Sequence, residues 1–377
     1  MRFKQRLTRS GHRQGLFLNA AVKSCTADME ACYIEALIIQ VIGTAMERRQ
    51  LLSAFGGLAV LPLAWPMAGL GQAPKLYRVG VISAGSFAPD TYPGRLTDQL
   101  THHFAQNGFT PGVNLELVKR ATEGHLDRLP GFVAELVTAK VNVIIAISYP
   151  VAAAVKEGTS TVPAVIFATG DPVQTHLVAS LNRPGGNITG ISDVAAELAP
   201  KRLELLKNAA PGLQRVALLW NAGNPGMTAR YEASAAAAKQ LNITVMALGV
   251  REPDDFEDAF ASMERSMPDG LLMVADALTA LNRKRVFDFA ARHRLPAIYE
   301  ADSFVRDGGL MSYGPDEVET AERGASLVER VLKGERPANL PLEQPTRFRL
   351  VVNLKTAQSL GLTIPPSILL LADELIQ

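Results

Sequence analysis

Cysteine is nearly absent from this sequence. The two cysteines, Cys25 and Cys32, both lie within the first 45 of the 377 residues. The rest of the chain therefore lacks the residues for a disulfide, a thiolate metal site or a cysteine nucleophile. The six histidines show no H-x-x-x-H or H-E-x-x-H spacing, so we expect no metal site.

Long runs of one charge are also missing. The formal net charge is +1, and residues 1–73 carry eight basic and four acidic residues, which leaves 30 basic and 33 acidic residues in the remainder. A nearly neutral body without a long basic run argues against nucleic acid as a partner. Aromatic residues make up only 6% of the chain, so few rings are available to stack on a ligand.

Motifs of nucleotide-binding and acyl-transfer enzymes do not occur. The sequence has no G-x-x-x-x-G-K-[ST] phosphate loop and no G-x-S-x-G nucleophile elbow. The stretch RPGGNITG has adjacent glycines instead of the G-x-G-x-x-G spacing of dinucleotide-binding proteins. We interpret it as a turn between two short strands, in which Gly185, Gly186 and Asn187 take positive φ. We therefore expect a protein that is not an enzyme and needs no cofactor.

Residues 46–73 have the three parts of a secretory signal. Arg48-Arg49 forms a short basic region, an apolar run follows over 51–65, and small residues precede a cleavage site near Gly71–Ala73. An uncleaved membrane anchor is the alternative, which the short run and its glycines and prolines disfavour. We expect an exported, periplasmic protein.

Residues 1–45 would precede this signal. An exported protein does not carry such a segment upstream of its signal, and 1–45 lacks the continuous apolarity of a membrane span. We interpret residues 1–45 as a mis-annotated upstream extension, with Met46 as the true start.

From Lys75 onward, short apolar strands alternate with helical segments, which predicts parallel sheets covered on both faces. The expected strands are 77–83, 115–120, 142–148 and 163–169, followed by 215–221, 243–249, 270–276 and 296–301. RVGVISAG at 78–85 resembles RVALLWNAG at 215–223, and VPAVIFA at 162–168 resembles LPAIYEA at 295–301. The offsets of 137 and 133 residues are nearly equal. We expect an α/β protein with two similar Rossmann-like lobes.

The end of the chain fits neither half alone. We expect a helix over 313–335 and a strand followed by a helix over 344–362. The expected first lobe comprises 76–192 plus about 314–343, and the second comprises 193–313 plus about 344–377. A chain that crosses several times between two lobes is suited to holding a ligand in the cleft and closing over it.

In such sheets, ligands bind beyond the carboxyl ends of the strands. In the first lobe this position selects Ser86, Ser148, Tyr149 and Asp171. The Ser148 hydroxyl and the free N–H groups of the following helix would bind a carboxylate, with the Tyr149 ring beside them. Ser148 and Asp171 could equally act as ordinary helix caps.

The corresponding loops of the second lobe contain Asn221, Asn224, Asp276 and Glu300. An acid such as Asp276 or Glu300 facing Ser148 across the cleft would bind an ammonium group. Such a pair of sites would suit a ligand that bears both an ammonium and a carboxylate.

Four segments carry a resemblance to a known family. They are PAVIFATGDPVQTHLVASLNRPGGNITGIS, RLELLKNAAPGLQRVALLWN, RHRLPAIYEADSFVRDGGLMSYG and QPTRFRLVVNLKTAQSLGLTIPPSILLLADELI. They resemble the ABC-transporter substrate-binding proteins typified by periplasmic tryptophan- and tyrosine-binding components, and the resemblance covers roughly 76–377. It implies the type I periplasmic-binding fold, with two Rossmann-like lobes joined by three crossovers around a ligand cleft.

The resemblance also implies a function. The protein would capture a small solute by lobe closure, an amino acid (aromatic ones included) or a similar molecule. As a monomer, it would deliver the solute to an ABC permease and ATPase at the inner membrane. It adds Tyr313 to the cleft-facing residues, and the rings near the cleft would be mainly Tyr149, Trp220, Tyr299 and Tyr313. The alternatives are a sensory solute-binding protein that reports to a membrane receptor, and an exported α/β hydrolase.

Overall fold

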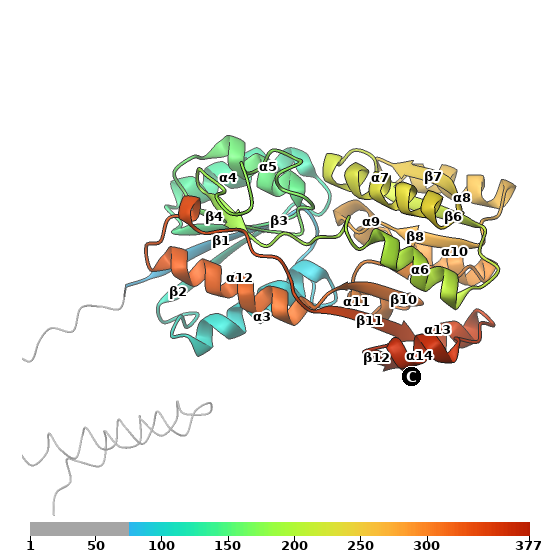
Figure 1. Cartoon of the computed structure of the whole chain (residues 1–377). Helices are drawn as coiled ribbons and strands as arrows, with labels where there is room; N and C mark the ends of the chain where they lie inside the picture. Colours follow the sequence, from blue (N-terminus) through green and yellow to red (C-terminus); the bar gives the residue numbers. More distant parts are fainter. Residues whose placement is uncertain (1–74) are drawn as a thin grey trace, which may run out of the picture. The chain divides into compact units, whose positions relative to one another are not determined.

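The computed structural model describes residues 75–377 (Figure 1). The expected signal at 46–73 and the expected extension at 1–45 lie outside the described residues. Within the described part, no helix combines the length and the apolarity that crossing a bilayer requires.

The first lobe is built on a five-stranded parallel sheet with the strand order β2-β1-β3-β4-β5. Its strands are β1 (Tyr77–Ser83), β2 (Leu115–Ala121), β3 (Val143–Ile147), β4 (Ala164–Phe167) and β5 (Ile188–Gly190). The helices are α3 (Tyr92–Gln106), α4 (Leu129–Thr138), α5 (Tyr149–Gly158) and α12 (Glu317–Leu332), with the short η1 (Leu126–Arg128) and η2 (Pro337–Asn339). Helices α3 and α12 cover one face of the sheet, and α4 and α5 cover the other.

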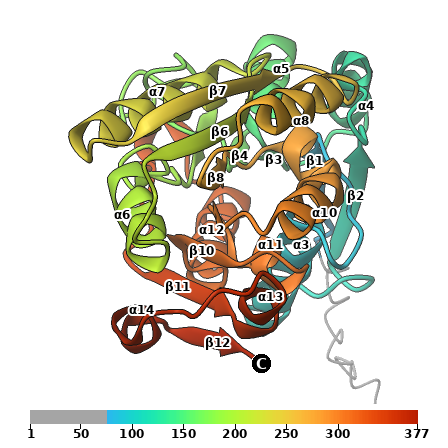
Figure 2. The ribbon, with the colours of Figure 1, turned by 90° about the vertical axis from the view of Figure 1, so that its right-hand side faces the viewer.

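The second lobe is built on a seven-stranded sheet with the order β12-β11-β10-β9-β8-β6-β7 (Figure 2). Its strands are β6 (Arg215–Asn221), β7 (Thr244–Val250), β8 (Gly270–Met273), β9 (Ala297–Tyr299), β10 (Met311–Pro315), β11 (Phe348–Asn353) and β12 (Glu374–Ile376). All neighbouring strands are parallel except β10 and β11. Both faces are covered by helices, and each face encloses a hydrophobic core.

The helices of the second lobe alternate with its strands. They are α6 (Ala199–Ala209), α7 (Pro225–Gln240), α8 (Asp255–Arg265), α9 (Ala277–Leu281), α10 (Arg283–His293), α11 (Asp302–Arg306), α13 (Leu354–Ser359) and α14 (Pro366–Leu371). The α/β class and the alternation expected from the sequence are confirmed. The expected helix at 313–335 is wrong at its start, because β10 extends to Pro315 and Asp316 caps α12.

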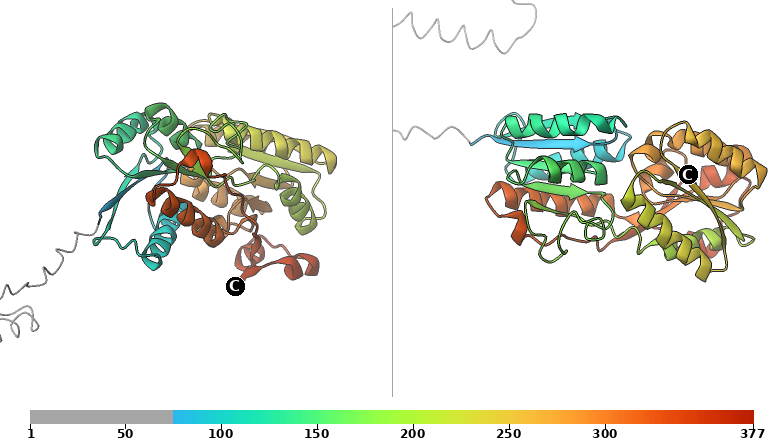
Figure 3. Two further views of the ribbon diagram at one scale, coloured as in Figure 1. Left: turned by 60° about the vertical axis from the view of Figure 1, so that its left-hand side comes forward. Right: turned by 90° about the horizontal axis from the view of Figure 1, so that it is seen from above.

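The chain passes between the two sheets three times. Residues 191–198 lead from β5 to α6, the junction at Pro315 and Asp316 leads from β10 to α12, and residues 333–347 lead from α12 to β11. Helix α12 thereby lies beside α3 in the first lobe (Figure 3). Two of the crossovers run side by side, because the Ser192 N–H donates to the Glu343 carbonyl at 2.9 Å.

The turn at RPGGNITG differs from its expected geometry at one residue. Gly185 and Gly186 have φ values of 70° and 64°, as expected, but Asn187 does not have positive φ. Its side-chain amide instead donates to the carbonyl oxygens of Thr159 at 3.0 Å and Val162 at 2.7 Å. The asparagine is needed for these two hydrogen bonds, which hold the loop between α5 and β4.

Helix α12 approaches β4 closely at Gly324. A Cβ atom added there would lie 2.2 Å from Cζ of Phe167, a side chain that is fully buried in the first-lobe core. No real Cβ atom tolerates this distance, so the core is packed around the missing side chain.

We expect Gly324→Ala to lower the free energy of unfolding by about 1–3 kcal/mol, because overpacking forces neighbouring groups to move. Gly131→Ala in α4 is the matched control, since nothing lies within 4 Å of a Cβ added there. This control should be neutral or more stable by up to about 1 kcal/mol, from helix propensity. Urea denaturation of both variants measures the difference, and equal effects would contradict the close-approach argument.

Candidate ligand-binding site

A cavity of about 170 Å³ lies between the two lobes and is lined by residues of both. The first lobe contributes loops that follow β1 and β3, and the second lobe contributes loops that follow β8 and β9. These are the carboxyl ends of parallel strands, where ligand sites of α/β proteins form. A cavity of about 150 Å³ is known to hold benzene, so this one can enclose a small organic molecule.

Four of the residues expected from the sequence line the cavity. They are Ser86 after β1, Ser148 after β3, Asp276 after β8 and Glu300 after β9. Ser148 has a φ of 94°, a backbone conformation that residues with a Cβ rarely adopt. Its hydroxyl is buried and has no hydrogen-bond partner among the described residues. Strain of this kind clusters at ligand sites.

The other five expected residues do not line the cavity. They are Tyr149, Asp171, Asn221, Asn224 and Tyr313.

Asp171 lies on the surface and caps the turn that follows it. Its carboxylate accepts the N–H groups of Val173 at 2.8 Å and Gln174 at 3.0 Å. The capping interpretation of this residue therefore accounts for its contacts.

The rings considered for ligand stacking are mostly engaged elsewhere. Trp220 stacks on Tyr231 with ring centroids 3.7 Å apart. Tyr299 is 1% exposed and stacks on Phe304. Tyr149 packs against a first-lobe core cluster, and Tyr313 packs against the core of the second lobe. Among the described residues, the aromatic side chains that line the cavity are Tyr92 and Phe304.

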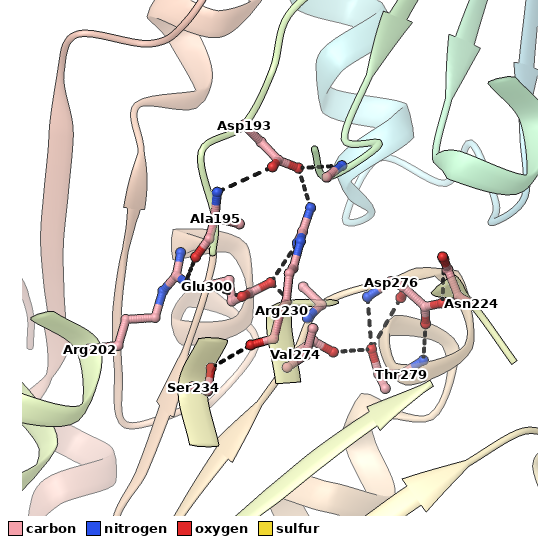
Figure 4. Close-up of polar contacts among 12 residues, drawn as sticks. Asp193, Ala195, Arg202, Asn224, Arg230, Ser234, Val274, Asp276, Thr279 and Glu300 are labelled. Carbon is pink, nitrogen blue, oxygen red and sulfur yellow. Dashed lines mark hydrogen bonds and ion pairs between the residues drawn. The ribbon is translucent and has the colours of Figure 1, made fainter. Parts of the chain in front are cut away.

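Asp276 is held by a capping box at the start of α9. Its carboxylate accepts the Thr279 N–H at 3.1 Å, and the Thr279 hydroxyl accepts the Asp276 N–H at 2.9 Å (Figure 4). The amides of Asn221 and Asn224 donate to its other oxygen at 2.7 and 3.4 Å. Asn221 and Asn224 therefore hold the Asp276 carboxylate in place. Burial raises the pKa of Asp276, although these hydrogen bonds oppose the shift.

Two arginines and two carboxylates form a buried charge cluster in the wall of the cavity. Glu300 accepts Arg202 Nη1 at 3.1 Å and Arg230 Nη1 at 2.8 Å, and Arg230 Nη2 pairs with Asp193. Arg202 is 1% exposed and Arg230 is 5% exposed. Figure 4 shows Glu300 among these side chains. The Glu300 carboxylate is already paired with two arginines. Of the two acids considered for an ammonium group, Asp276 is therefore the more available.

The same cluster binds backbone groups in one crossover and in β10, just before another. Arg202 donates from Nη1 to the Ala195 carbonyl and from Nε to the Tyr313 carbonyl, both at 2.7 Å. Asp193 accepts the Gly170 N–H at 3.4 Å. Helices α6 and α7 are therefore connected to two crossovers and to the loop after β4.

The two arginines respond differently to this environment. Burial lowers the pKa of Arg202, and its pairing with Glu300 opposes the change only in part. Burial acts on Arg230 in the same direction, but its pairs with Asp193 and Glu300 outweigh burial and raise the pKa. Arg202 Nη2 and Arg230 Nε have no hydrogen-bond partner among the described residues.

A second charged group lies where α12 begins. Glu317 lines the cavity and accepts Arg95 Nε at 3.2 Å. Burial, followed by the charge of Asp302, raises the pKa of Glu317 to about 7. Burial and the charge of Glu317 also raise the pKa of the Tyr92 hydroxyl.

The sequence reasoning missed Arg202, Arg230 and Asp193. A signal for Arg202 was present, because it precedes Leu205, Leu206 and Ala209 at helical spacing and thus lies on the apolar stripe of α6. A lone cation on such a stripe requires a buried partner. Within residues 75–377, no group of three or more metal-ligating side chains is brought together.

The fold and the cavity define a two-lobed ligand-binding protein. Residues 98–376 match the family model described as ABC transporter substrate binding protein, and the chain belongs to this family. The resemblance stated from the sequence is therefore confirmed, as is the type I periplasmic-binding fold.

Similar proteins agree with this assignment. The chain is 25% identical over 255 residues to a tyrosine-binding protein of Clostridioides difficile (strain R20291), covering 68% of this chain and 73% of the relative. It is also 25% identical to a solved ABC domain in complex with L-Trp from Streptococcus pneumoniae, with a TM-score of 0.74, covering 80% of this chain and all of that one. A conserved domain protein from Vibrio cholerae gives 25% identity and a TM-score of 0.75 at the same coverage.

Family membership has direct functional consequences. The family consists of substrate-binding proteins, so the chain is a binding protein and the hydrolase alternative is wrong. Its partners are a small-molecule ligand and a membrane transporter, and proteins of this family typically work outside the cytoplasm.

We expect Arg202→Met to lower the free energy of unfolding by about 3–5 kcal/mol, because loss of one partner leaves an uncompensated buried charge. Lys201→Met is the matched control, since Lys201 is the preceding residue and forms an exposed pair with Glu204 at 3.3 Å. Loss of such a pair costs at most about 1 kcal/mol. Chemical denaturation compares the two variants, and equal losses would show that the buried cluster does not stabilise the fold.

Proposed function

We propose that the protein captures an amino acid with an apolar side chain, tyrosine and tryptophan included, for import through an ABC transporter. The observation that carries this proposal is the cavity between the lobes, which takes its lining from both. A ligand held there contacts two separately folded sheets at once. Its binding energy therefore favours the arrangement in which the lobes are closed.

The lining suits an apolar ligand body. Ile147, Ile191, Leu281 and Phe304 line the cavity together with several alanines. Ligand sites typically combine such walls with a few polar groups that fix orientation. The tyrosine-binding relative and the L-Trp complex support the same class of ligand.

The polar ends of the ligand would bind on opposite sides. The ligand carboxylate would accept hydrogen bonds from the Ser148 hydroxyl and from the first N–H groups of α5, where the helix dipole favours a negative charge. The ligand ammonium would pair with Asp276 in the second lobe. Ser86, on the loop after β1, would contribute a further hydroxyl.

The protein would act in the periplasm as a monomer. After cleavage near Gly71–Ala73 it would meet the ABC permease and ATPase at the inner membrane. Closure over the ligand would produce the shape that the permease recognises. Exchange with the transporter then requires reopening, so affinity must be balanced against release.

A ligand screen on the full chain tests the proposal. L-Tyrosine, L-tryptophan and L-leucine would be compared with purines, sugars and small organic acids by thermal shift and then by calorimetry. A ligand present at 100 times its dissociation constant adds about 2.7 kcal/mol of stability. We expect stabilisation by the amino acids, and stabilisation by a sugar or purine alone would contradict the proposed ligand class.

We expect Asp276→Asn to weaken amino-acid binding about tenfold or more, because a hydrogen bond to a charged group contributes about 1.5–3 kcal/mol. Asp171→Asn is the matched control, since Asp171 also caps a turn but does not line the cavity. Its ligand affinity should be unchanged. Equal losses in both variants would contradict a specific role for Asp276.

The pH profile supplies a second test of Asp276. Because burial raises the pKa of this carboxyl, it becomes neutral on acidification earlier than an exposed aspartate does. A neutral carboxyl cannot form an ion pair with an ammonium group, so affinity should fall on the acid side. Calorimetry across pH should show a smaller fall in Asp276→Asn, and an identical fall would assign the titration to another group.

A further inference from the structure

Arg283, the first residue of α10, uses all three nitrogens of its guanidinium group. Nε donates to Asp307 Oδ2 at 2.7 Å, Nη1 donates to the Ala280 carbonyl at 2.9 Å, and Nη2 donates to Asp90 Oδ2 at 2.8 Å. The first two partners belong to the second lobe, as Arg283 does. These two hydrogen bonds orient the Arg283 side chain so that Nη2 points towards Asp90.

Asp90 belongs to the other lobe, on the loop between β1 and α3. The ion pair of Asp90 and Arg283, which we name the cross-cleft pair, therefore spans the opening between the lobes. Asp90, Arg283 and Asp307 all line the ligand cavity. The same three residues also line a neighbouring cavity of about 530 Å³. The cross-cleft pair thus forms part of the wall between the ligand cavity and this outer cavity.

The loop that carries Asp90 is itself held in place. Arg95 donates from Nη1 to the Asp90 carbonyl at 2.7 Å, and from Nε to Glu317 at 3.2 Å. The Thr91 side chain caps α3 and donates to the Ser86 carbonyl at 2.7 Å. The loop is therefore fixed to the start of α12, directly after a crossover. Movement of one lobe relative to the other has to break or form the cross-cleft pair.

An apolar side chain lies near the pair. Leu281, which lines the ligand cavity, faces Gly124 of the first lobe, and a Cβ atom added to that glycine would lie 3.4 Å from Leu281 Cδ1.

We propose that Arg283 determines ligand affinity as a positioning residue, by holding the lobes closed through Asp90. It acts on the ligand through the position of the lobe walls, and no direct contact is required. The Asp90 side chain is 60% exposed and that of Arg283 is 19% exposed. A pair this accessible is weak and screened by salt, so it can open each time the ligand is released. This inference rests on the proposed function only in the choice of the ligands that are used to test it.

The first experiment is a double-mutant cycle in the full chain, with Asp90→Asn, Arg283→Gln and the combined variant. L-Tyrosine and L-tryptophan serve as probes. Each single variant should bind about two- to fivefold more weakly at low ionic strength, mainly through faster dissociation. The combined variant should bind the ligand no more weakly than the single variant with the lower affinity, because the two residues act as one pair.

Lys284→Gln is the matched control. Lys284 is the next residue of α10 and pairs at 2.9 Å with Asp288, within the same helix. Its affinity should equal that of the wild type. Raising the ionic strength from about 0.01 to about 1 M shortens the screening length from about 30 to about 3 Å and should bring all variants to the wild-type value. Additive losses, or losses that persist in high salt, would overturn the proposal.

The second experiment needs no ligand. Spin labels at the exposed sites Asp127→Cys in η1 and Arg292→Cys in α10 report the distance between the lobes, with Cys25 and Cys32 replaced by Ser. In ligand-free protein, Arg283→Gln should shift the distance distribution towards longer values, and Lys284→Gln should not.

The two experiments separate the possible failures. If the wild type binds neither probe but the label distances lengthen in Arg283→Gln, the proposed ligand class fails and the role of Arg283 stands. If the probes bind but distances and affinities are unchanged, the role of Arg283 is overturned. Should Arg283→Gln fold poorly, Asp90→Asn alone decides the matter, because Asp90 is exposed and its loss leaves Arg283 paired with Asp307.

Discussion

The buried ion pairs of Glu300 with Arg202 and Arg230 are the interaction on which the arrangement of this protein depends. One carboxylate at the end of β9 joins α6 to α7, and the arginines extend to Asp193 and to two backbone carbonyls at the crossovers. Charges this deeply buried require partners, since removal from water is expensive. The network therefore determines where the crossovers leave the second lobe, and with them one side of the ligand cavity.

The cavity is lined by two kinds of polar group, those that are paired within the protein and those that are available to a ligand. The charged side chains of the cluster mostly satisfy one another, whereas the Ser148 hydroxyl has no partner within residues 75–377 and Asp276 keeps a carboxylate at the cavity. Small apolar residues form much of the remaining wall. This combination agrees with the family, whose members bind substrates and do not convert them.

The ion pairs that line the cavity differ in their exposure. Arg202 and Arg230 are almost fully buried, so their ion pairs are shielded from salt. Asp90 is exposed, and its pairing with Arg283 is open to solvent. In the proposed function the lobes open and close repeatedly, which requires strong interactions where the lobes are joined and weak ones where they separate.

The sequence by itself determined the α/β class, most of the strand positions and the strand-end loops from which Ser86, Ser148, Asp276 and Glu300 reach the cavity. These features follow from local periodicity and from the geometry of parallel sheets, which place successive strand ends at one edge. Only the tertiary structure decided which charges meet. Arg202 and Glu300 are 98 positions apart, and Arg230 and Asp193 are 37 apart. No local pattern records such a pairing, because it arises only when distant helices and crossovers pack against the same strand ends.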